Sequence, residues 1–241
     1  MQWFIGCSGF HYKDWKNKFY PEKLPQTKWF DFYSGQFNTL ELNVTFYRFP
    51  RLSALENWYK KSPANFCFAV KAPRLITHYK KFNDCDRMLS DFYTTSREGL
   101  KEKLGPVLFQ LPAQIKYDET LLQKIIGSMD PNFINVVEFR HESWWQKKVY
   151  DELAAKQIVF CSISHPKLPD NVIHNNSIIY YRYHGVPKLY YSQYDEEVIT
   201  ATGVSIMNSP SLNSAYIYFN NTATMAAINN ARQLESITRS T

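Results

Sequence analysis

Eight short strand-like runs recur along the chain, and this repetition constrains the fold more than any other feature of its 241 residues. Each run is bounded by glycine, proline or a polar cluster, and the runs span residues 4–9, 39–43, 66–72, 106–111, 135–140, 158–163, 178–185 and 215–221. Segments with helical periodicity lie between most of them, and strands that alternate with helices indicate a parallel sheet with right-handed crossovers. Eight such units predict an α/β fold, a (β/α)8 TIM barrel, formed by a single domain over residues 1–241.

The segments between the runs support the barrel, with one exception. Residues 52–59 place their apolar side chains on one helical face, Asp118 is positioned to cap a helix, and a third apolar face is predicted to begin at Trp144 and Trp145. Residues 164–177 contain two prolines and show no clear helix. An open, doubly wound sheet is the alternative architecture, but no Gly-x-Gly-x-x-Gly motif follows the first run to favour it.

The cysteines bear on the compartment in which the protein works. They are Cys7, Cys67, Cys85 and Cys161. Because they lie far apart and three of them fall in apolar strand-like runs, we expect reduced thiols in the core and a cytoplasmic location. The chain opens directly into a strand, and no run approaches the roughly 18–20 apolar residues that span a bilayer. No membrane partner is expected.

Polar and charged residues gather at the C-terminal ends of the runs, and strand geometry places them on one face. Residues i and i+2 of a strand share a face. Three such pairs are Glu41 with Asn43, Glu138 with Arg140, and Arg182 with His184. The neighbours of opposite parity are apolar or aromatic and would pack against helices. The charged face should therefore point into the barrel at its C-terminal end, where TIM-barrel enzymes build their active sites.

The loops after these runs add polar and aromatic side chains to the predicted site. The first loop, residues 10–25, is longer than the roughly 2–6 residues of most βα loops, and such loops are often functional. We expect most of the 17 tyrosines and 17 phenylalanines to fill the core instead. The residues predicted to bind a substrate are Ser8, Tyr12, Asn43, Tyr47, His78, Gln110, Arg140, Arg182, Asn220 and Asn221.

A series of motifs extends over nearly the whole chain. They are IGCSGF at 5–10, KDW at 13–15, FYP at 19–21, ELNVTFY at 41–47, FAVKAP at 68–73, TH at 77–78, LGPVLFQLP at 104–112, EFRHESW at 138–144, RYHG at 182–185 and FNN at 219–221. In these motifs the chain resembles the YecE-like family, bacterial and archaeal proteins classed as a domain of unknown function. The resemblance implies a TIM barrel and no established activity. The family often has an acidic residue near the end of the sixth strand, where this chain has residues 162–165 without one.

Two glutamates are candidates for acid–base catalysis. Glu41 and Glu138 lie on the second and fifth runs, so their side chains are predicted to meet across the barrel mouth as a carboxylate pair of the kind that glycosidases use. The alternative is that each glutamate forms an ion pair, Glu138 with Lys71 or Arg140 for example, and only fixes the geometry of the site. Both interpretations stay open at this point.

Positive charge dominates the rest of the predicted site. The cationic candidates are Lys71, Arg140, Arg182 and His184. They outnumber the two glutamates, which favours an anionic substrate such as a phosphorylated or carboxylated sugar. The predicted catalytic residues are Glu41, Glu138, Lys71 and His184. His78 or His184 can transfer protons near neutral pH, and Lys71 is either a nucleophile of depressed pKa or an ordinary ion-pairing lysine.

No metal or other cofactor is expected. A metal site made by Glu41, Glu138 and His184 has no supporting motif, and the neighbouring cations argue against it. The sequence favours a hydrolase or isomerase without a redox cofactor, acting on a small anionic or carbohydrate-like metabolite. The formal charge of +6 also admits a nucleic-acid-directed protein, and the alternative is a solvated basic surface. A non-catalytic ligand-binding module is the remaining alternative.

Overall fold

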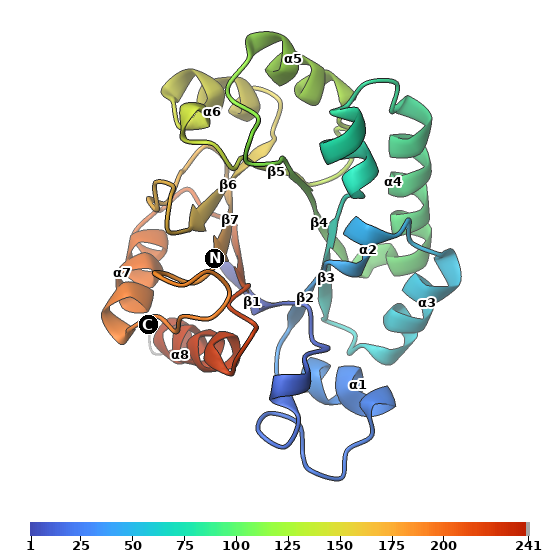
Figure 1. Ribbon diagram of the computed structural model, residues 1–241, viewed down its shortest axis with the longest axis vertical. Helices are drawn as coiled ribbons and strands as arrows, with labels where there is room; N and C mark the ends of the chain where they lie inside the picture. Colours follow the sequence, from blue (N-terminus) through green and yellow to red (C-terminus); the bar gives the residue numbers. More distant parts are fainter. Residues whose placement is uncertain (240–241) are drawn as a thin grey trace. The chain divides into compact units, whose positions relative to one another are not determined.

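The computed structural model describes residues 1–239, and its parallel strands form a closed barrel in the order β1 to β8 (Figure 1). The strands are β1 (Gln2–Ser8), β2 (Thr39–Leu42), β3 (Cys67–Lys71), β4 (Leu104–Gln110), β5 (Asn135–Glu138), β6 (Val159–Ser164), β7 (Ile178–Tyr183) and β8 (Ser214–Phe219). Each predicted run overlaps one strand, so the predicted TIM barrel is confirmed. Most predicted runs extend one or two residues past the strand, and Arg140 and His184 therefore follow β5 and β7.

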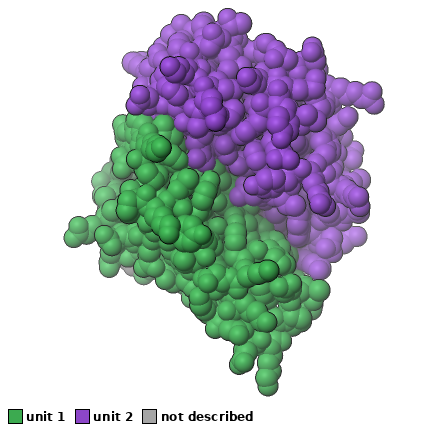
Figure 2. Space-filling model, viewed as in Figure 1, with its two compact units in different colours: residues 1–41, 162–241 green, residues 42–161 purple. Residues whose placement is uncertain are grey.

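The chain forms two compact units (Figure 2). Residues 1–41 and the chain from residue 162 onward form one, here called the terminal unit, and residues 42–161 form the central unit. The α-helices of the terminal unit are α1 (Trp29–Ser34), α7 (Glu196–Met207) and α8 (Ala226–Arg239). Those of the central unit are α2 (Val44–Tyr47), α3 (Leu52–Lys61), α4 (Asp86–Leu100), α5 (Glu119–Ser128) and α6 (Lys147–Ala154).

Two of the predicted helical segments are confirmed, and one is wrong at its start. The predicted face in residues 52–59 lies in α3, and the Asp118 carboxylate accepts the backbone N–H of Leu121 at 2.8 Å, as an N-cap of α5 should. The third helical face does not begin at Trp144 and Trp145 as predicted. Trp144 ends a 3-10 turn, and both residues precede the start of α6. Trp144 is fully buried and its indole donates to the backbone carbonyl of Ile115 in the loop between β4 and α5, so core packing accounts for this aromatic residue.

The segment between β6 and β7 contains no helix, as the sequence predicts. All of residues 165–177 are described, and they form only turns, bends and irregular backbone.

In β7, the prediction that side chains of opposite parity face opposite sides of the strand is confirmed. The rings of Tyr181 and Tyr183 pack together with centroids 4.7 Å apart, and Thr202 of α7 lies near both phenols, so these side chains face a helix, opposite to Arg182.

The first loop contributes to the core of the terminal unit. Trp15 is fully buried, and its indole donates a hydrogen bond to the carbonyl oxygen of Thr224 at 2.8 Å. Tyr20 stacks on Trp29 of α1 with ring centroids 4.3 Å apart. The buried Trp15 and the stacked pair of Tyr20 and Trp29 agree with the prediction that most aromatic side chains fill the core.

All four cysteines are buried and none of them forms a disulfide, in agreement with the expectation of core thiols. Burial raises the pKa of the Cys7 thiol well above its ordinary value, which keeps this group protonated. Within residues 1–239, no helix is long and apolar enough to cross a membrane.

Candidate functional site

Polar side chains at the C-terminal ends of the strands form one cluster in each unit. In the terminal unit, Glu41 at the end of β2 is fully buried and uses both carboxylate oxygens. One accepts from Nη2 of Arg182 at 2.7 Å, and the other accepts from the hydroxyl of Tyr180 at 2.6 Å. Ser8 adds its hydroxyl 3.5 Å from the same Arg182 nitrogen. Arg182 and Tyr180 are as deeply buried as Glu41, so this ion pair is excluded from solvent.

His184 follows β7 in the same unit and is held by an asparagine. The amide Nδ2 of Asn220 lies 2.9 Å from Nδ1 of His184. If the amide donates, the imidazole of His184 carries its proton on Nε2 when it is neutral. The ring of His165 approaches edge-on, with centroids 6.0 Å apart. Asn220 therefore orients the imidazole of His184.

Two other predicted residues of the terminal unit make local structural contacts. The hydroxyl of Tyr12 donates to the backbone carbonyl of Ser8, and burial raises the pKa of Tyr12 to about 12. Asn221 is fully buried and donates to the carbonyl oxygen of Ser192 at 2.9 Å and to the side chain of Asn230 in α8 at 3.1 Å. These bonds attach the loops that follow β7 and β8 to α8.

The central unit gathers two cations at the ends of β3 and β5. Lys71 is buried, donates to the amide oxygen of Gln110 at 2.6 Å, and has its ammonium 4.2 Å from the ring centroid of Phe46. Arg140 is bonded through Nε to the carboxylate of Glu138. Glu138 is fully buried, whereas the side chain of Arg140 keeps 10% of its surface exposed. The ion pair between Glu138 and Arg140 is one of the alternatives that the sequence leaves open.

His78 lies beside these cations and is half-buried. Its Nδ1 is 2.8 Å from the hydroxyl of Thr77, and its ring meets Phe46 edge-on at 5.0 Å. Burial lowers the pKa of His78, and the positive charges of Lys71 and Arg140 lower it further. The imidazole is therefore neutral at pH 7 and can accept a proton.

The remaining predicted residues of the central unit lie at its edge. Tyr47 is 65% exposed, and the guanidinium of Arg74 lies 5.6 Å from its ring centroid and 5.5 Å from that of Tyr79. Asn43 follows β2, and its buried Oδ1 has no hydrogen-bond donor within residues 1–239.

Two residues of these clusters were not predicted. Tyr180 shares the inward face of β7 with Arg182, two residues away, so the parity rule contains the signal for it. Cys161 lies with its sulfur 3.9 Å from the second oxygen of Glu138, and its apolar strand context predicts only core packing. Among residues 1–239, no group of three metal-ligating side chains could hold a metal ion. The carboxylate pair of Glu41 and Glu138 stays a prediction.

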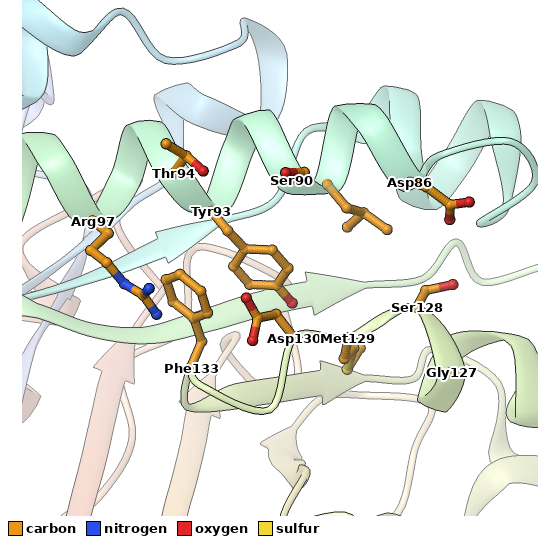
Figure 3. Close-up of a pocket in the computed structure, with 11 residues that line it drawn as sticks. Asp86, Ser90, Tyr93, Thr94, Arg97, Gly127, Ser128, Met129, Asp130 and Phe133 are labelled. Carbon is orange, nitrogen blue, oxygen red and sulfur yellow. The ribbon is translucent and has the colours of Figure 1, made fainter.

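A pocket of about 270 Å³ in the central unit contains none of the predicted residues (Figure 3). It lies between α4 and the segment that leads from α5 to β5, near the start of β5. Arg97 occupies its wall, with the guanidinium 4.0 Å from the ring centroid of Phe133 and a hydrogen bond to the carbonyl of Asn132. Asp86 and Asp130 give this pocket mixed charge.

Comparison with known sequences gives relatives of unknown function. The chain is 29% identical over 116 residues to the UPF0759 protein YecE of Escherichia coli K12, a match that covers 48% of this chain and 42% of YecE. It is 28% identical over 156 residues to the UPF0759 protein YunF of Bacillus subtilis, with 62% of this chain and 54% of YunF covered. The chain thus spans about half the length of the curated relatives it matches.

Comparison with solved structures extends over the whole chain. A DUF72 family protein of Thermotoga maritima superposes with a TM-score of 0.89 at 28% identity, over 99% of this chain and 100% of that one. A DUF72 family protein of Enterococcus faecalis, at 18% identity, shares the fold with a TM-score of 0.82 over 99% and 98% of the two chains. The family described as "Protein of unknown function DUF72" matches residues 4–241. This chain therefore belongs to the DUF72 family, in agreement with the resemblance to YecE-like proteins.

Proposed function

We propose that the strand ends of the central unit bind a small anionic metabolite, such as a phosphorylated or carboxylated sugar, and convert it by acid–base chemistry. The observation that supports this most directly is the gathering of Lys71, Arg140 and His78 near one carboxylate, Glu138. Two basic side chains, Lys71 and Arg140, with the carboxylate of Glu138 would give the cluster a net positive charge when the lysine is protonated. A buried or half-buried position strengthens the attraction of such a cluster for an anion.

The two cations have complementary roles in this proposal. Lys71 supplies a point charge that is directed by Gln110 and Phe46. Arg140 uses Nε for Glu138, and its guanidinium carries further N–H donors of the geometry that suits carboxylate and phosphate groups. Glu138 thereby acts as a positioning residue for Arg140. Glu41 has the same relation to Arg182 in the terminal unit.

His78 is the proton-transferring group of the proposal. Its lowered pKa keeps the imidazole neutral near pH 7, so it can take a proton from a substrate carbon or hydroxyl and return it later. Lys71 and Arg140 would stabilise the negative charge that develops on the substrate during this transfer. This chemistry fits an isomerase or a hydrolase.

A thermal-shift screen with phosphorylated and carboxylated sugars, each paired with its neutral parent sugar, tests the binding step. We expect stabilisation by the anionic compounds alone and a loss of affinity of about tenfold or more in Lys71→Gln. Lys156→Gln is the matched control, because Lys156 is an exposed lysine of the same unit. Equal stabilisation by neutral sugars, or equal effects of the two substitutions, would show that the proposal is wrong.

Turnover of the compounds that bind, followed by NMR, tests the catalytic step. His78→Gln should lower the rate by about 10²–10⁴-fold and change the affinity little. Binding without conversion of any bound compound would favour a ligand-binding module instead.

A nucleic-acid-directed function is the second candidate, and one observation favours it. Arg74 lies between the exposed rings of Tyr47 and Tyr79, an arrangement on which bases can stack. Retention on heparin along a salt gradient separates the two candidates. A site for the phosphate backbone should hold the protein on heparin until the salt concentration is raised, because such binding is largely electrostatic. Elution at low salt would therefore favour the metabolite.

A further inference from the structure

A second pocket of the central unit, of about 440 Å³, lies between α2, α3 and the loop that joins them, and the proposed chemistry does not use it (Figure 1 locates both helices). The apolar residues that line it are Val44, Phe49, Pro50, Ala54, Leu55 and Trp58. Pockets of this size with apolar walls and a few polar groups are typical of sites for small organic molecules.

The charged side chains that line this pocket are both arginines. Arg48 and Arg51 are exposed, and neither guanidinium makes a hydrogen bond or ion pair with any residue from 1 to 239. No acidic side chain of the described residues lines the pocket. Two guanidinium groups without a counter-ion beside an apolar surface favour a ligand that brings its own negative charge.

The other polar group of the lining is already used by the fold. The hydroxyl of Thr45 lies 2.9 Å from the carbonyl oxygen of Leu42 and 2.6 Å from that of Lys71, so its single proton is directed to the backbone. Arg48 and Arg51 are therefore the polar side chains of the lining that can bind a polar group of a ligand. Phe46, the next residue of α2, contacts Lys71 and His78, and neither of these lines the pocket. The pocket is thus a different site from the cationic cluster of the proposed function.

We propose that this pocket binds an amphipathic organic anion, a small molecule with an aromatic or aliphatic body and one carboxylate or phosphate group. The body would pack against Phe49 and Trp58, and the anionic group would be held by Arg48 and Arg51. The pocket in Figure 3 has no such preference, because its lining carries both signs of charge and Arg97 is already engaged.

Calorimetric titration with three probes tests the ligand class. The probes are 1-naphthylacetate, its neutral isostere 1-naphthaleneacetamide, and acetate. We expect 1-naphthylacetate to bind at least about tenfold more tightly than the amide, because only the carboxylate can pair with the arginines. Acetate should show no measurable binding, because it lacks the apolar body. Equal affinity for the acid and the amide would overturn the proposal.

Substitutions locate the bound probe. The double variant Arg48→Gln/Arg51→Gln should weaken 1-naphthylacetate about tenfold or more, and Ala54→Phe should abolish its binding by filling the pocket. All three positions are exposed, so cooperative melting should be retained. Arg87→Gln, an exposed arginine on α4, is the control and should bind like the wild type.

Three further outcomes would each overturn the proposal that this pocket binds a small organic anion. If Lys71→Gln abolishes binding of 1-naphthylacetate while the arginine and Ala54 variants retain it, the probe occupies the cluster of the proposed function and this pocket is not an anion site. If a peptide of glutamate and phenylalanine residues binds more tightly than 1-naphthylacetate and Ala54→Phe abolishes that binding, the occupant is an acidic protein segment. Association of the protein that Ala54→Phe prevents, measured by sedimentation, would assign the pocket to a second copy. Either result would overturn the small-molecule proposal.

Discussion

The strand-end clusters of the two units use the same residue types and differ in their balance of charge and in their burial. In the terminal unit, both oxygens of Glu41 are bonded, one to Arg182 and one to Tyr180, and all three side chains are excluded from solvent. In the central unit, Lys71 and Arg140 accompany a single carboxylate, and half-buried His78 lies beside them. A balanced, solvent-free network fixes side chains in place, whereas an excess of positive charge near the surface attracts a ligand. We therefore propose that the first cluster has a structural role and that the second binds a ligand.

The largest effect should come from removing the cation of the terminal cluster. Arg182→Met leaves the fully buried carboxylate of Glu41 without its ion-pair partner, and we expect a loss of about 3–5 kcal/mol in the free energy of unfolding. Denaturant unfolding measures it. The double variant Glu41→Leu/Arg182→Met should recover much of this loss, since it removes the stranded charge. A loss below about 1 kcal/mol in the single variant would mean that the terminal cluster is not a structural ion pair.

The equivalent substitution in the central cluster should cost less stability. Lys71→Gln removes the hydrogen bond to Gln110 and the contact with the ring of Phe46, while the pair of Glu138 and Arg140 remains. These two interactions are worth about 1–2 kcal/mol together, and the same denaturant measurement checks this value. A cost equal to that of Arg182→Met would remove the distinction between the two clusters.

The sequence contains the architecture of both clusters but not their pairing. Strand number and the inward face follow from periodicity, because glycine, proline and i, i+2 spacing are local properties. The direction of the Glu138 side chain across the strand end is not a local property of the sequence, so strand parity alone does not predict its ion pair with Arg140. The sequence predicts a helix at Trp144 because an apolar turn followed by a helix resembles one longer apolar face. The two arginines beside the α2–α3 pocket follow no strand-end pattern, so strand parity predicts no binding site there.

The pKa of His78, measured by NMR in sulfate and in chloride at equal ionic strength, decides whether the central cluster binds an anion. A divalent anion bound by Lys71 and Arg140 would offset the positive charges that lower this pKa, so we expect a higher pKa of His78 in sulfate. His174 is the control, because burial alone lowers its pKa and no cation is involved. An unchanged pKa of His78 in sulfate, or an equal rise for His174, would contradict the assignment of anion binding to the central cluster.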